Sequence, residues 1–322
     1  MSSVVLDTML EKMNKYLTLE ANEICINTPK ELMIDRNSQW EIIRDEEIDE
    51  DFLDTLAIQL ATTRRQQFDE IHCHLSCELP PPYLRYRIQV QHKATLFNSD
   101  CSVVIRIPSK TRFPLESFIL SQKVTQAGWN YEKIKDIVKQ QGEHKKNILI
   151  SGGTGSGKTS FLNALIENIP LEERIISIED SQELFIPHHN KVQLAVPKQE
   201  SLHYNYEIAI NNTMRMRPDR LFLGEIDTRN TFPFLRINNT GHGGSLSTLH
   251  ANSPEDAIKA IITNIILRGS LQNPNRAMLI DYICTAIHYI VQIRRESNKR
   301  IITDILDLTK EKERLILEAK NG

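Results

Sequence analysis

Residues 147–160 read NILISGGTGSGKTS, an apolar run that passes directly into a glycine-rich turn and then into an amphipathic stretch. The turn meets the pattern G-x-x-x-x-G-K-[ST], in which glycines let successive backbone N–H groups point at an anion without a Cβ in the way. Because an expected strand precedes it and an expected helix follows it, the segment predicts a phosphate-binding loop. The residues expected to surround the phosphates are Gly152, Gly153, Thr154, Gly155, Ser156, Gly157, Lys158, Thr159 and Ser160.

Two side chains of this loop carry specific expectations. Lys158 is expected to reach the β- and γ-phosphates of a nucleotide, and the Thr159 hydroxyl is expected to contact Mg²⁺. The ordinary alternative is a glycine-rich turn in an unrelated loop. The strand and helix patterns on either side favour the phosphate-binding interpretation.

The rest of the chain divides into two patterns. From about residue 118 onward, helical and strand patterns alternate, which is typical of an α/β domain with a parallel sheet and helices on both faces. The first third mixes a helical opening with short alternating strands and predicts a smaller α+β domain. Pro108 and Pro114 lie between the two patterns. We therefore expect an N-terminal domain over residues 1–107, a linker over 108–117 and a C-terminal domain over 118–322.

The predicted strands of the second domain all end in reactive side chains. The strands are expected at 147–151, 174–178, 220–223 and 245–249, and each is an apolar run of the buried type. In open α/β sheets, ligands bind outside the carboxyl ends of the strands. After the phosphate loop, the other three ends carry Glu179-Asp180, Gly224-Glu225 and Thr248 with His250.

Glu225 follows its strand where nucleotide hydrolases keep the carboxylate that orients water or holds Mg²⁺ through its solvent shell. The residue before it is glycine, whereas many such enzymes have aspartate there. We therefore expect Glu179 or Asp180 to assist with the metal. The alternatives are an ordinary helix N-terminal acid at Glu225 and a solvated turn at Glu179-Asp180.

Hydrolysis also requires cations against the charge that develops on the γ-phosphate. Arg215 and Arg217 precede the strand at 220–223, and Arg87 and Arg106 lie on predicted strands of the first domain. These four are the candidates, although a surface arginine taken alone is more often solvated.

Two histidines flank a glycine-rich turn, GHGGSLSTLHA at residues 241–251. His242 lies in the turn and His250 follows the strand. A turn of this kind beside a nucleotide could sense the γ-phosphate, whereas a lone histidine is usually structural.

Composition excludes several classes of protein. The 322 residues are 40% hydrophobic and carry a net charge of −3 without a block of Lys or Arg, which disfavours binding along a nucleic-acid backbone. No apolar run reaches the roughly 18 residues of a membrane span, and the N-terminus lacks an export signal. With an odd count of five cysteines, these features predict a reduced, cytosolic protein.

Four ordered motifs give the chain a family resemblance. The phosphate loop, the acidic box at 178–180, the arginine-containing run at 214–225 and the histidine box at 241–251 resemble those of the type II/type IV secretion ATPases. The sequence IRIPSKT at 105–111 and Arg87 are similar to the N-terminal sheet of the type IV secretion traffic ATPases. The tetracysteine zinc motif of many type II assembly ATPases is missing, which favours the type IV branch.

This resemblance implies a fold and an activity. It implies a C-terminal RecA-like P-loop ATPase domain, a smaller N-terminal domain, and ATP with Mg²⁺ bound between them in a homo-hexameric ring. ATP hydrolysis in such a ring is coupled to assembly of a type IV secretion system, or to export of protein or DNA, as in conjugation. Its partners are coupling and inner-membrane proteins, with peripheral association on the cytoplasmic face of the inner membrane and no sequence-specific nucleic-acid binding.

The resemblance also implies roles for individual residues. Lys158 and Thr159 bind phosphate and Mg²⁺, Glu225 is the favoured base, and Glu179 is its acidic-box partner, with the metal held partly through water. Arg87 and Arg106 reach the nucleotide from the N-terminal domain, and Arg215 and Arg217 are candidates at the subunit boundary. His242 and His250 belong to the nucleotide-binding set.

One departure and three alternatives accompany this assignment. The family usually has an arginine two residues after Gly-Glu, whereas here Ile226-Asp227 follows and the nearest arginine is Arg229. A pilus-assembly or retraction motor, or a type II secretion motor, shares all four motifs. A P-loop small-molecule kinase predicts a monomer or dimer, and a non-hydrolysing scaffold has no need of Glu179 and Glu225.

Overall fold

Alternating apolar residues in the first third build an antiparallel sheet with one buried face. The computed structural model describes residues 4–36, 39–64, 66–108, 112–196, 203–269 and 275–321. The chain divides into two compact units, Met1–Thr111 and Arg112–Gly322. The first unit has a six-stranded sheet in the order β3-β2-β1-β6-β5-β4, with every neighbouring pair antiparallel. Its elements are α1 (Val4–Leu17), β1 (Glu23–Thr28), β2 (Glu31–Arg36), β3 (Gln39–Arg44), α2 (Glu50–Thr63), β4 (His74–Glu78), β5 (Arg87–Gln91) and β6 (Ser102–Arg106).

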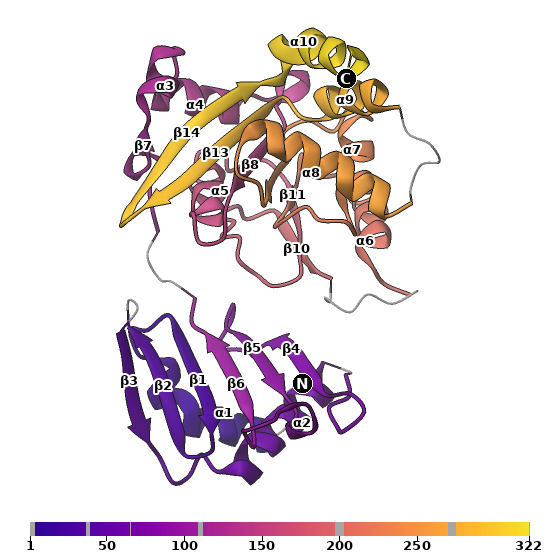
Figure 1. The fold of residues 1–322 in the computed structure, drawn as a ribbon. Helices are drawn as coiled ribbons and strands as arrows, with labels where there is room; N and C mark the ends of the chain where they lie inside the picture. Colours follow the sequence, from indigo (N-terminus) through magenta and orange to yellow (C-terminus); the bar gives the residue numbers. More distant parts are fainter. Residues whose placement is uncertain are drawn as a thin grey trace. The chain divides into compact units, whose positions relative to one another are not determined.

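Two helices cover the buried face of this sheet (Figure 1). Helix α1 is amphipathic, because Leu6, Met9, Leu10, Met13 and Leu17 recur at helical spacing and all are buried. Asp49 caps the start of α2, since its side chain accepts a hydrogen bond from the Phe52 N–H.

The second unit has an eight-stranded sheet in the order β10-β9-β11-β12-β8-β13-β14-β7. The six strands from β10 to β13 in this order are parallel, and β14 is antiparallel to β13. The predicted parallel sheet is therefore confirmed, and the four predicted strands are its central neighbours β9, β11, β12 and β8. The strands are β7 (Ile119–Leu120), β8 (Ile148–Gly152), β9 (Ile175–Glu179), β10 (Lys191–Ala195), β11 (Arg220–Leu223), β12 (Leu246–Leu249), β13 (Tyr289–Glu296) and β14 (Lys299–Asp307).

Helices cover both faces of this sheet (Figure 1). Ile148 and Ile150 of β8 point into a core with α4 and α5, whereas Leu149 between them points into a second core with α6 to α10. Because successive side chains of a strand face opposite sides, one apolar run supplies both cores. The helices are α3 (Gln122–Gln126), α4 (Tyr131–Lys139), α5 (Lys158–Ile166), α6 (Tyr206–Thr213), α7 (Thr231–Asn238), α8 (Pro254–Leu267), α9 (Arg276–Ala286) and α10 (Leu308–Asn321).

The junction between the two units is partly described. Residues 109–111, which belong to the expected linker and to the IRIPSKT segment, lie outside the described residues. Leu115, also in the expected linker, is buried in the core that α4 and α5 share. Among the described residues, no helix is long and apolar enough to cross a membrane.

Candidate nucleotide site

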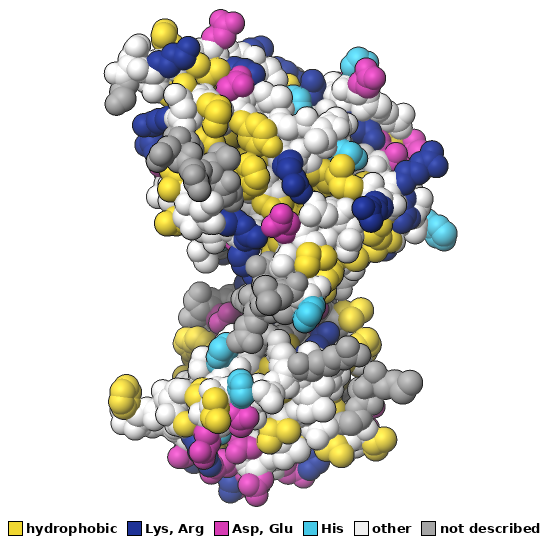
Figure 2. Space-filling view, turned by 90° about the vertical axis from the view of Figure 1, so that its right-hand side faces the viewer, with side chains coloured by type: hydrophobic (Ala, Val, Ile, Leu, Met, Phe, Trp, Pro, Cys, Tyr) yellow, Lys and Arg dark blue, Asp and Glu magenta, His cyan; other side chains and the backbone are white. Residues whose placement is uncertain are grey.

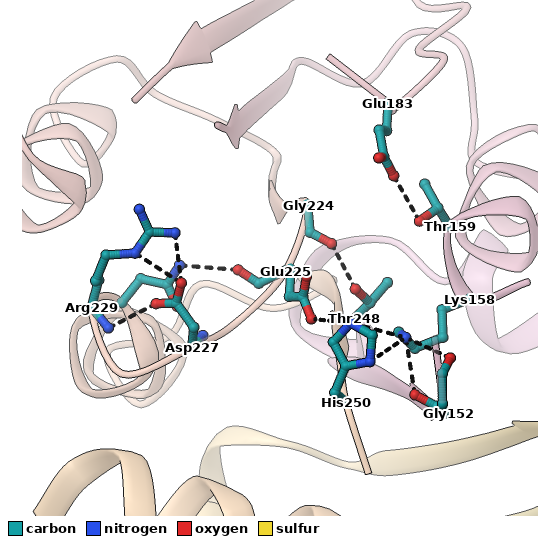
Figure 3. Close-up of polar contacts among 12 residues, drawn as sticks. Gly152, Lys158, Thr159, Glu183, Gly224, Glu225, Asp227, Arg229, Thr248 and His250 are labelled. Carbon is teal, nitrogen blue, oxygen red and sulfur yellow. Dashed lines mark hydrogen bonds and ion pairs between the residues drawn. The ribbon is translucent and has the colours of Figure 1, made fainter. Parts of the chain in front are cut away.

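The phosphate-binding loop leaves β8 at Gly152 and ends where α5 begins at Lys158 (Figure 3). Gly157, the residue before the helix, has a φ of 99°, a left-handed conformation that residues with a Cβ rarely adopt. This conformation turns the chain so that the first N–H groups of α5 face the loop. Those N–H groups have no partner within the helix and form an anion site.

Lys158 and Glu225 are joined by His250. The ammonium Nζ of Lys158 lies 3.1 Å from His250 Nδ1, and His250 Nε2 lies 3.0 Å from a carboxylate oxygen of Glu225. Since an ammonium only donates, Nδ1 must accept from Lys158, and the ring proton is on Nε2, where it donates to Glu225. This series of three side chains thus links a cation, a neutral imidazole and a carboxylate (Figure 3). Lys158 also donates to the carbonyl oxygens of Gly152 and Gly153, at 2.9 and 3.1 Å.

The surroundings shift the pKa of each group in this chain. Partial burial raises the pKa of Glu225, Lys158 opposes the rise, and Asp227 adds to it. Burial, with help from the Lys158 charge, lowers the pKa of His250 and keeps the imidazole neutral. Burial also lowers the pKa of Lys158, against the pull of Glu225 and Glu183. A carboxylate whose pKa lies above its usual range is a stronger base, which suits general-base catalysis.

Thr159 contacts an acid that the sequence reasoning missed. Its hydroxyl donates to a carboxylate oxygen of Glu183 at 2.9 Å. A hydroxyl and a carboxylate oxygen are the hard ligands that Mg²⁺ takes directly or through water, so these two side chains fit a divalent ion beside the phosphates. The signal in the sequence was a third acid, four residues after Glu179 in the same loop.

Glu179 shapes this loop. It is 4% exposed, and its Oε1 accepts hydrogen bonds from the N–H groups of Glu183 and Leu184, both at 2.9 Å. A Cβ on Gly224 would lie 3.2 Å from the Cγ of Glu179. The glycine that replaces the usual aspartate therefore makes room for Glu179, and Glu179 in turn positions the backbone that carries Glu183.

Three other predicted residues lie at the opposite edge of the sheet. Arg215 and Arg217 precede β11, and His242 precedes β12. The turn that carries His242 packs against Lys145, which comes before β8, because a Cβ on Gly243 would lie 2.9 Å from the Lys145 carbonyl oxygen. Within one chain, His242 and His250 therefore lie before and after β12, so the prediction that both contact a nucleotide places them at two different edges of the sheet. A strand length separates them, since His250 follows the carboxyl end of β12.

Arg87 and Arg106 lie side by side in the first unit. The two residues are directly opposite each other on β5 and β6, and their outer neighbours on β4 and β1 are Glu78 and Glu23. Like charges in directly opposite positions destabilise a sheet unless an anion lies near them. The neighbouring acids supply part of that compensation.

Arg229 is held by its own turn. Its guanidinium Nε and Nη2 donate to one carboxylate oxygen of Asp227 at 2.8 and 2.6 Å, and it lies over the ring of Tyr206. Asp227, the residue that stands where the family usually has arginine, thus fixes Arg229 in place.

A phosphate loop on a parallel sheet, with a carboxylate and a histidine after the neighbouring strands, defines a P-loop ATPase of the RecA-like fold. Comparison with known proteins narrows this class. The sequence model described as "Type II/IV secretion system protein" matches residues 85–320. A type IV secretion system protein VirB11 of Bartonella quintana is 30% identical over 92% of this chain and 91% of its own length.

Solved structures agree with that match. The VirB11 ATPase from the Brucella suis type IV secretion system is 25% identical, with a TM-score of 0.52, and the match covers 98% of each chain. The pilus retraction motor PilT has a TM-score of 0.66 at 17% identity, over 97% of this chain and 88% of its own, and shares the fold. The chain belongs to the type II/IV secretion system protein family, as a type IV secretion traffic ATPase.

Proposed function

We propose that this ATPase works as a hexameric ring that couples hydrolysis of Mg·ATP to assembly of, or export through, a type IV secretion system. The chain of contacts from Lys158 through His250 to Glu225 supports the proposal most directly, because it joins the phosphate-binding cation to the candidate base. Family membership supplies the secretion context.

In this proposal Glu225 accepts the proton of the attacking water. A phosphate would compete with His250 for the Lys158 ammonium, since both are acceptors for the same donor. When Lys158 turns to the phosphate, the bond from His250 to Glu225 is freed to rearrange around the water. His250 would thus respond to the presence of the γ-phosphate, and its hydrogen bond would transmit that response to Glu225.

The metal position fits Thr159 and Glu183. Mg²⁺ neutralises charge on the phosphates and orients them for displacement. Thr159 is the proposed direct ligand. Glu183, with Glu179 behind it, holds the surrounding water and keeps the Thr159 hydroxyl directed at the ion.

The remaining predicted residues are assigned to a second copy of the chain or to the first unit. Arg215, Arg217 and His242 lie at the amino edge of the sheet, so we assign them to the phosphate site of a neighbouring subunit in the ring. On the family resemblance, Arg87 and Arg106 are also assigned to the nucleotide. Such rings are proposed to sit on the cytoplasmic face of the inner membrane beside channel and coupling proteins.

The proposal includes no sequence-specific binding of nucleic acid by this chain and leaves protein and DNA open as cargo. On the face drawn in Figure 2, Lys and Arg side chains are interspersed with acidic and apolar ones over the described residues. A protein that follows a phosphate backbone gathers its basic side chains into a stripe.

The test of the proposed activity is Mg²⁺-dependent release of phosphate from ATP. Lys158→Ala is expected to abolish turnover, because it removes the phosphate-binding cation. Lys139→Ala, at an exposed lysine of the same unit, is the matched control and should keep wild-type turnover. Wild-type rates in Lys158→Ala would show that phosphate is released elsewhere and would overturn the assignment.

A further inference from the structure

A second cation lies against the phosphate loop, on the side away from Glu225. Arg300 belongs to β14, whose hairpin with β13 extends past the carboxyl end of β8, because Ile293 is already level with Gly152 (Figure 1). A Cβ on Gly157 would lie 2.7 Å from Cδ of Arg300 and 2.8 Å from its Nε. The arginine side chain thus occupies the space directly over the last residue before α5.

Arg300 is held in place without an acid. Its guanidinium carbon lies 3.8 Å from the centre of the Phe113 ring, a cation–π contact. Its Nε is buried and has no hydrogen-bond partner, and within the described residues no carboxylate pairs with it. A buried Nε–H without a partner on a half-buried charged side chain is costly, so an anion at this place would be stabilised.

The surrounding charges point to the same ligand. Arg295 lies directly opposite Arg300 on the hairpin, and burial together with this like charge lowers the pKa of Arg300. Opposed like charges destabilise a hairpin unless an anion compensates them. The nearest anion site is the phosphate loop beneath the guanidinium.

The order of strands decides which part of a nucleotide Arg300 meets. Strand β8 lies between β12, which leads to His250, and β13, which carries the hairpin. The hydrolytic groups therefore lie on one side of the loop and Arg300 on the other. A polyphosphate with its γ-phosphate near Glu225 has its α-phosphate toward the hairpin.

We propose that Arg300 is a second phosphate-binding cation of this site, which contacts the polyphosphate at its α-phosphate end. This inference rests on the proposed nucleotide function. Because ADP keeps the α-phosphate, Arg300 contributes equally to binding of ADP and ATP. It is therefore a binding residue with little effect on the chemical step.

The test is calorimetric titration of the full chain with Mg·ADP. Arg300→Gln is expected to raise Kd about tenfold, the loss of one charge-assisted hydrogen bond, and Arg300→Lys to recover part of that loss. Arg294→Gln is the matched control, because Arg294 is an exposed arginine of the same hairpin. It lies opposite Ile301, whereas Arg295 lies opposite Arg300. An unchanged Kd in Arg300→Gln overturns the inference.

Two further measurements separate phosphate binding from other roles. Arg300→Gln should weaken Mg·ADP and Mg·UDP by the same factor, and a penalty confined to ADP would assign Arg300 to the base and overturn the proposal. The KM for ATP should rise with Kd, while kcat stays within about twofold. If Arg300→Gln and Phe113→Leu lower the Tm by the same amount and leave Kd unchanged, Arg300 contributes only to packing against Phe113. That result also overturns the proposal.

The titration needs no hydrolysis, so the two proposals can fail separately. A wild-type chain that binds Mg·ADP but releases no phosphate from ATP refutes the hydrolytic function and leaves the Arg300 comparison valid. A wild-type chain that hydrolyses ATP, with full ADP affinity in Arg300→Gln, refutes the Arg300 inference alone.

Discussion

The residue type at several positions of the site is determined by the space and the hydrogen bonds of the neighbouring side chains. Gly224 is the clearest case, because the Glu179 carboxylate lies directly over it. Glu179 cannot move away easily, since it accepts two backbone hydrogen bonds from the loop that follows it. A departure from the usual aspartate at position 224 is therefore explained by packing on a buried acid.

Gly224→Ala is expected to lower the free energy of unfolding by about 1 to 2 kcal/mol, the usual effect of overpacking a tight site. Urea denaturation would measure it. Gly153→Ala is the control, because a Cβ there meets no atom within 4 Å. Equal urea midpoints for the two variants would show that the Glu179 side chain moves aside without loss of stability.

Glu225→Gln keeps the shape of the side chain and removes the base. We expect kcat to fall about 10²- to 10³-fold, with ADP affinity nearly unchanged, because general-base catalysis contributes to the chemical step. Single-turnover phosphate release would show the loss. Glu255→Gln, at an exposed acid of α8, should retain the wild-type rate; a similar loss there would refute a specific role for Glu225.

Elements position the site through the register of the sheet. The central strands are parallel and adjacent, so their carboxyl ends bring Gly152, Glu179, Glu225 and His250 to one edge. At the other edge, Asn147, which precedes β8, contacts the residues just before β12 and β13 and the end of α9. Its side chain accepts from the Ser245 N–H and donates to the Ala286 carbonyl, and its own N–H donates to His288 Nδ1 at 3.0 Å.

His288 makes the stability of this edge depend on pH. Burial, with the nearby charge of Lys146, lowers the pKa of His288 to about 4. An unfolded histidine has a pKa of about 6.5, so the unfolded chain binds the extra proton first as the pH falls. The contribution of His288 to the free energy of unfolding is therefore complete above about pH 6.5. It is lost as the pH falls toward 4, by about 3 kcal/mol at most.

Urea denaturation across this pH range would measure the loss. His288→Asn, which keeps an acceptor for the Asn147 N–H without a titrating group, should remove that part of the pH dependence. Parallel curves for wild type and variant would mean that His288 titrates normally in the folded chain.

The loop after β9 carries the acid that meets Thr159. Glu183→Gln is expected to raise the Mg²⁺ concentration for half-maximal turnover about tenfold, because residues behind a metal ligand tune metal affinity by this order. The rate at saturating Mg²⁺ should change little. If the Mg²⁺ dependence stays the same, the contact between Thr159 and Glu183 is only structural.

At the scale of the whole molecule, the residues of the proposed site lie at opposite edges of one sheet. Lys158 and Glu225 lie at the carboxyl edge, and Arg215, Arg217 and His242 at the amino edge. Head-to-tail packing of identical subunits brings unlike edges together, and it closes into a ring when the rotation allows. The distribution of residues therefore supports a site completed between copies.

Mixing two inactive variants tests this arrangement. Lys158→Ala and Arg217→Gln rings should each lack activity, but random mixed rings restore about one quarter of the sites, where an intact Arg217 meets an intact Lys158. Phosphate release after subunit exchange is the measurement. No recovery in verified mixed rings would place Arg217 outside the neighbour's site.

The sequence by itself determined the fold of the second unit and placed Lys158, Glu179, Glu225 and His250 at or after the ends of its strands. Apolar runs, a glycine-rich turn and proline breaks are local signals, and buried parallel strands produce them wherever they occur. This is why the four central strands and the phosphate loop were predicted correctly.

Only the tertiary structure decided how those residues combine. The bridge from Lys158 through His250 to Glu225 depends on β12 lying beside β8, and the separation of His242 from His250 depends on the direction of β12. Glu183 and Arg300 approach the loop from segments that are distant from it in the sequence or unmarked by any motif. Such contacts are set by strand order and side-chain packing between elements, which no local pattern of residues encodes.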